Sequence, residues 1–97
     1  MYEHRKKKRK LIAYPYNVYA TVFEIEKSDE SIRKNYYDAF SQLSERSQKI
    51  IESYFRDLKT LDEIAQELRL TPERVRQLTN IALHQIHHII TERNADI

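Results

Sequence analysis

The chain of 97 residues contains no glycine. Glycine-rich phosphate loops and dinucleotide-binding turns need backbone without a Cβ atom, so sites of this kind are excluded. Tight β-hairpin turns also favour glycine, which argues against an all-β fold. Cysteine is absent as well, which excludes disulfides and cysteine-bound zinc. We therefore expect a small all-α protein that uses no cofactor.

From residue 28 onward, apolar residues recur with the period of an α-helix. Ser28 or Asp29 can cap a first helix, and Ser44 can cap a second. The buried faces of these two helices are predicted to be Ile32, Tyr36, Ala39, Phe40 and Leu43, followed by Ile50, Ile51, Tyr54, Phe55 and Leu58.

Two further capping signals follow, one short helix apart. Thr60 and Glu63 form a capping box, and Thr71 precedes Pro72, which is well placed at the first helical position. A short turn between two such helices is typical of a helix-turn-helix. We thus predict a four-helix domain over residues 28–97, with a last helix from 72 to about 91. Arg69 falls where the turn usually holds a left-handed glycine, at a cost on the order of 1 kcal/mol.

The last helix is predicted to have one polar and one apolar face. The apolar residues are Val75, Leu78, Ala82, Ile86 and Ile89, and the polar ones are Glu73, Arg76, Gln77, Asn80 and His84. In the major groove, Arg bonds guanine, Gln and Asn bond adenine, and Glu accepts from cytosine. Arg74 flanks this face and suits a phosphate contact. The helix pair therefore favours DNA binding over an ordinary solvated surface helix.

A run of basic residues stands near the N-terminus, formed by Arg5, Lys6, Lys7, Lys8, Arg9 and Lys10. By contrast, residues 11–97 carry 11 basic and 14 acidic side chains. A basic arm of this kind indicates an anionic partner, nucleic acid or anionic lipid, or else a solvated terminus. We expect residues 1–10 to be a disordered arm.

Residues 11–27 form a short aromatic segment. A turn is predicted at residues 14–17, and residues 18–26 suit either a short extended segment or a helix that starts after Asn17. The aromatic side chains of this segment are expected to pack on the body. The segment is too polar for a signal peptide and no apolar run is long enough to span a bilayer, so we expect a cytoplasmic protein without a membrane partner.

Two strings in the helix pair, at residues 60–65 and 73–77, read T-L-D-E-I-A and E-R-V-R-Q. They resemble T-L-E-E-I-A and E-R-I-R-Q in region four of bacterial sigma factors, the domain that reads the minus-35 promoter element. The resemblance covers about residues 35–86. It departs at Pro72, where the family has a DNA-contacting arginine, and at Arg69, which replaces the turn glycine.

The resemblance implies binding to double-stranded promoter DNA and docking onto the β flap of bacterial RNA polymerase. By position, it implies that Glu73 and Gln77 meet base edges, that Arg74 and Arg76 contact bases or phosphates, and that Thr60 contacts a phosphate. The candidate DNA-contacting residues are therefore Thr60, Thr71, Glu73, Arg74, Arg76, Gln77 and Asn80.

The chain has no room for the DNA-melting and core-binding regions of a complete sigma factor. We expect half of a split sigma factor, a coactivator or another regulator of initiation. One alternative is a region-four mimic that binds polymerase or a sigma partner without reading DNA, and another is a stand-alone repressor. His84 and His88 lie one turn apart, but zinc needs a third protein ligand, so no metal site is expected. Nor is catalysis expected, since no catalytic arrangement is evident.

Overall fold

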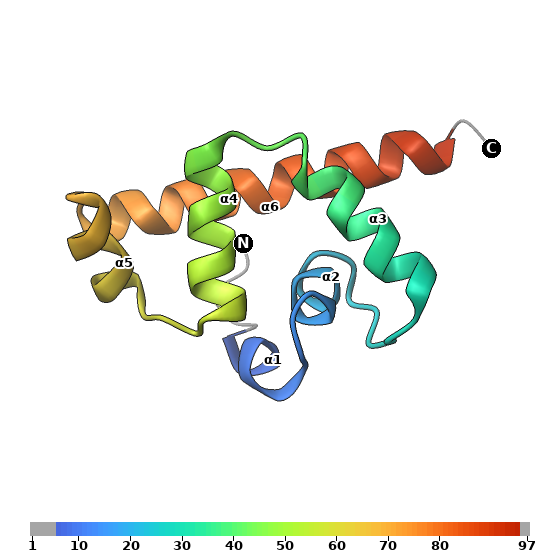
Figure 1. The fold of residues 1–97 in the computed structure, drawn as a ribbon, viewed down its shortest axis with the longest axis horizontal. Helices are drawn as coiled ribbons and strands as arrows, with labels where there is room; N and C mark the ends of the chain where they lie inside the picture. The colour runs from blue at the N-terminus through green and yellow to red at the C-terminus, as the bar shows by residue number, and fades with distance from the viewer. Residues whose placement is uncertain (1–5, 96–97) are drawn as a thin grey trace.

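The computed structural model describes the backbone of residues 6–95, and every element in that range is helical (Figure 1). The elements are α1 (Lys6–Leu11), α2 (Tyr16–Phe23), α3 (Glu30–Phe40), α4 (Glu45–Ile51), the π-helical turn η2 (Glu52–Arg56), α5 (Leu61–Leu68) and α6 (Pro72–Ala95). The expected all-α fold with a helix-turn-helix is confirmed. Two short helices precede the four predicted ones: α1, which was not expected, and α2, which was one of the two alternatives for the aromatic segment.

The helix starts follow the capping residues of the sequence. The Asp29 carboxylate accepts from the amide of Ile32 at 3.0 Å, so Asp29 rather than Ser28 caps α3. The Ser44 hydroxyl accepts from the amide of Ser47 at 3.2 Å and caps α4. Each bond satisfies an amide at a helix start that has no partner within the helix.

The long helix α6 is the element on which α2, α3, α4 and α5 pack (Figure 1). The core contains apolar side chains from each of these helices, and its fully buried members include Val18, Tyr36, Ile50, Ile51, Ile64, Val75, Leu83, Ile86 and Ile90. Because Val18 of α2 belongs to the same core as Ile90 of α6, the aromatic segment and the body pack together rather than lying apart.

Leu58 departs from the expected buried face. It is 41% exposed and adopts a left-handed backbone conformation, with φ of 57°. The helix ends at Arg56, where the amide of Asp57 bonds the carbonyl of Glu52 at 2.9 Å, and the chain then turns away from the core. The helical period therefore no longer applies at Leu58.

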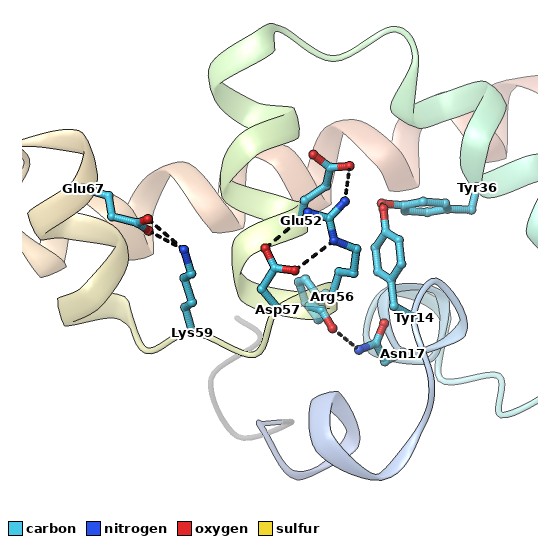
Figure 2. Close-up of polar contacts among 9 residues, drawn as sticks. Tyr14, Asn17, Tyr36, Glu52, Arg56, Asp57, Lys59 and Glu67 are labelled. Carbon is cyan, nitrogen blue, oxygen red and sulfur yellow. Dashed lines mark hydrogen bonds and ion pairs between the residues drawn. The ribbon is translucent and has the colours of Figure 1, made fainter.

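Helix α2 replaces the extended segment that was one of the two expectations for residues 18–26. It begins at Tyr16 and ends at Glu24, which has a left-handed conformation. The aromatic side chains pack as expected: the ring of Tyr14 meets that of Tyr36 edge to face at 5.5 Å, and their hydroxyls are 2.6 Å apart (Figure 2). Burial raises the pKa of Tyr14 to about 12.

The expectation of a disordered basic arm is wrong for residues 6–10, which lie in α1. Residues 1–5, including Arg5, lie outside the described residues. Arg9 is buried, and its guanidinium donates to the carbonyls of Tyr54 at 3.0 Å and Lys59 at 3.2 Å. It also lies 4.0 Å from the centre of the Tyr54 ring. Carbonyls at the end of a helix attract a cation, and buried carbonyls require donors, so Arg9 faces inward.

Asn17 completes this arrangement. Its side-chain amide donates to the carbonyl of Phe55 at 2.8 Å (Figure 2) and to the carbonyl of Arg9 at 3.0 Å. The N-terminal segment thus supplies donors to two carbonyls at the end of η2, and the same asparagine holds the backbone of α1 in place.

Candidate nucleic-acid interface

The two N-caps of the helix-turn-helix form as the sequence predicts. The Thr60 hydroxyl accepts from the amide of Glu63 at 3.1 Å, and the Glu63 carboxylate accepts from the amide of Thr60 at 2.8 Å. The bond from this amide holds the pKa of Glu63 below its usual value. At the next helix, the Thr71 hydroxyl accepts from the amide of Arg74 at 3.1 Å, and Pro72 is the first residue of α6. These bonds fix the starts of both helices.

The turn between α5 and α6 holds Arg69 in a left-handed conformation, with φ of 58° and ψ of 44°. The amide of Leu70 donates to the carbonyl of Ala65 at 2.9 Å, and the amide of Arg69 to that of Gln66 at 3.4 Å. This pair of bonds is the Schellman arrangement, which usually has glycine at the left-handed position. The turn therefore forms without glycine, and Arg69 carries the backbone strain.

The exposed surface at the start of α6 gathers four of the candidate side chains. The Glu73 carboxylate accepts from the Arg76 Nε at 3.0 Å and pairs with the Arg76 Nη2 as well. It also accepts from the Gln77 amide at 3.5 Å, while the Gln77 oxygen accepts from Arg74 at 3.3 Å. The bond with Arg76 holds the pKa of Glu73 below its ordinary value, so Glu73 is ionised at neutral pH. Glu73, Arg74, Arg76 and Gln77 thus form one network opposite the fully buried Val75.

Asn80 does not belong to this exposed surface. It is 8% exposed, so the expectation that it lies on an open polar face is wrong. Leu83 and Ile90, on the same flank of the helix, are also buried. Because several helices pack on α6, its buried arc is wider than the single stripe that the sequence predicts. The exposed polar surface at the start of α6 therefore ends at Gln77 and resumes only at His84.

The hydroxyls of Thr60 and Thr71 remain suited to phosphate contacts. Both residues are exposed, and each hydroxyl accepts a capping bond. A hydroxyl that accepts one bond can still donate its proton to another acceptor. The N-termini of α5 and α6 also carry the positive ends of their helix dipoles, which favour anions.

Comparison with known proteins agrees with this geometry. The family model described as Sigma-70, region 4 matches residues 39–88, just over half of the chain. The chain belongs to the sigma-70 region 4 family. Its helix-turn-helix is therefore a DNA-binding domain of transcription, from a family that interacts with DNA and RNA polymerase. No curated protein matches the chain, and no solved structure does.

The histidines of this region-four domain lie on the second half of α6. His87 stacks on Phe23 with ring centres 5.0 Å apart, and His88 lies 3.9 Å from Glu92. Within residues 6–95, no group of three potential metal ligands comes together, and no described helix is long and apolar enough to cross a membrane.

Arg9 and Asn17 are the residues whose roles sequence reasoning missed. Arg9 is hidden in a run of like charges, and Asn17 stands in a turn-like context. One signal was available: Asn17 directly precedes the mainly apolar run of residues 18–22, which the structure buries. A buried amide needs a partner, and the carbonyls at the end of the helix at Arg56 need donors from outside the helix.

Proposed function

We propose that this region-four domain binds promoter DNA sequence-specifically, with the start of α6 in the major groove, while it contacts the β flap of bacterial RNA polymerase in the cytoplasm. The observation that carries the proposal is the exposed network of Glu73, Arg74, Arg76 and Gln77 beside two capped helix starts. The domain acts by binding, and it catalyses no reaction.

The contacts within the network can be exchanged for contacts with DNA. An exposed ion pair such as that of Glu73 and Arg76 is worth at most about 1 kcal/mol, whereas a bidentate contact to a base discriminates by about 1–3 kcal/mol. In the groove, Glu73 accepts from cytosine and Gln77 bonds adenine, as their chemistry allows. Arg74 and Arg76 meet phosphates or guanine, and the threonine hydroxyls meet phosphates.

The test is footprinting on promoter fragments, with and without RNA polymerase. We expect protection of a short upstream site. Gln77→Ala should remove the contact to one base of that site and so weaken binding by roughly 1–3 kcal/mol. The matched control is Gln85→Ala, an exposed glutamine of α6 outside the network, which should bind as the unaltered protein does. Protection by neither the protein alone nor its mixture with polymerase would refute the proposal.

A second candidate function follows from the pairing of Glu73. Its carboxylate accepts hydrogen bonds from both Arg76 and Gln77 in the free protein. In addition, Pro72 stands where the family has a DNA-contacting arginine. A protein whose polar groups stay paired in this way would be a region-four mimic that binds polymerase without reading DNA. Tight binding to an isolated β flap, together with no DNA binding at low salt, would favour the mimic.

A further inference from the structure

The sequence of helix α1 is strongly basic. Its six residues include Lys6, Lys7, Lys8 and Lys10 besides the buried Arg9, and Lys10 is exposed. The remainder of the chain after Lys10 has an excess of three acidic residues, from its 11 basic and 14 acidic side chains. The basic residues of α1 therefore lie in a different part of the chain from the polar network on α6.

The contacts of Arg9 place α1 beside the start of α5. The Arg9 guanidinium bonds the carbonyl of Lys59, which directly precedes the N-cap Thr60. Lys59 is itself tied to α5, because its ammonium pairs with Glu67 at 2.7 Å (Figure 2). Figure 1 shows α1 below the loop that leads into α5. The charge of α1 is thus held near the helix start that suits a phosphate.

Both the side chain and the backbone of Arg9 are held. The guanidinium bonds two carbonyls, and the Arg9 carbonyl accepts from Asn17, whose amide also bonds Phe55. Arg9 and Asn17 are both more than nine-tenths buried. A helix anchored in this way stays in one place on the domain, unlike a flexible basic tail.

We propose that α1 is a fixed second contact to the DNA phosphate backbone, next to the contact at the start of α5, and that Arg9 is the positioning residue that holds it there. This inference rests on the proposed DNA-binding function. A helix of six residues is about 9 Å long, which suits two or three phosphates of one strand. Leu11 is the one strongly exposed apolar residue of the helix, too little to enter a lipid surface.

Two substitutions that each remove one positive charge test the positioning role. The readout is the slope of log affinity against log salt for a duplex that carries the footprinted site. Lys10→Gln should make the slope shallower by about 0.9, the contribution of one phosphate contact. Arg9→Gln should make it shallower by more than that, up to about 2–3, because the two or three phosphate contacts of α1 depend on its anchored position. Equal effects of the two changes, or no effect of Arg9→Gln, would overturn the proposal.

A second measurement keeps the test independent of the stability of the Arg9 variant. Since the chain has no cysteine, Lys10→Cys provides a unique site for a tethered iron chelate that cleaves nearby DNA. A fixed α1 predicts cleavage within one window of a few nucleotides at one edge of the footprint. Glu92→Cys, exposed near the far end of α6, is the control and should not cleave that window.

Three results would contradict the inference, and they are distinguishable. Cleavage spread over both edges of a normal footprint would mean a mobile arm, and the proposed function would stand. Binding of the protein to phosphatidylserine vesicles, with unchanged salt slopes on DNA in both variants, would mean that α1 meets lipid. The absence of any footprint with the unaltered protein would overturn the DNA-binding function and this inference together.

Discussion

Replacing Asn17 with alanine should destabilise the domain strongly, although the residue lies outside the helix-turn-helix. Asn17 is 1% exposed, and its amide nitrogen donates to the carbonyls of Phe55 and Arg9 at 2.8 and 3.0 Å. Alanine has no side-chain donor, so the carbonyls of Phe55 and Arg9 each lose the hydrogen bond from residue 17. Leaving a buried polar group unsatisfied costs about 1–3 kcal/mol, so we expect a loss of about 2–4 kcal/mol in the free energy of unfolding.

A loss of that size is large for a domain of this length. At about 0.05–0.15 kcal/mol per residue, 97 residues correspond to a total stability of about 5–15 kcal/mol. Each kcal/mol lowers Tm by about 4–8 °C in a domain of 60–100 residues, so Tm should fall by at least about 8 °C. The change should also loosen α1, because the Arg9 carbonyl loses the donor that holds it.

Urea unfolding followed by circular dichroism at 222 nm measures this loss, with thermal melts as a second readout. Thr21→Val is the matched control. Thr21 is equally buried in α2, but its hydroxyl bonds only the Asn17 carbonyl within the same helix, at 2.8 Å. We expect this control to lose no more than about 1 kcal/mol. If Asn17→Ala lies within about 0.5 kcal/mol of the unaltered protein, or loses no more than the control, the N-terminal segment does not stabilise the end of η2.

Three other changes test the helix pair itself. Val75→Asp places an unpaired charge at a fully buried position and should abolish the helical circular dichroism signal; an unchanged Tm would show that the buried face of α6 is misassigned. Arg69→Gly should raise the free energy of unfolding by about 0.5–1 kcal/mol in urea titrations, because glycine adopts φ of 58° without strain; a decrease would contradict the strain argument. Because the pKa of Glu63 is lowered from 4.5 in the folded state, its charge stabilises the domain above that pH, and this stabilisation is lost as the pH falls. Glu63→Gln retains an acceptor oxygen but should show a smaller drop in Tm between pH 7 and pH 3, whereas parallel curves for the two proteins would exclude this role.

The sequence by itself determined the elements whose causes are local. Thr60, Thr71 and Asp29 cap helices because each side chain accepts a hydrogen bond from the amide three residues ahead, and no distant segment takes part. Val75 is buried on α6 because the helical period places it opposite Glu73. The family resemblance rests on these same strings of residues.

Only the tertiary structure decided which polar residues are buried. Arg9 looks like one more charge of a basic run, and it turns inward because it meets carbonyls 45 and 50 residues away in the chain. Asn80 looks like part of an open polar face, and it is buried because several helices pack around α6. The helical period of the sequence shows which face of one helix is apolar. The burial of a polar side chain depends instead on which residues of the other helices pack beside it.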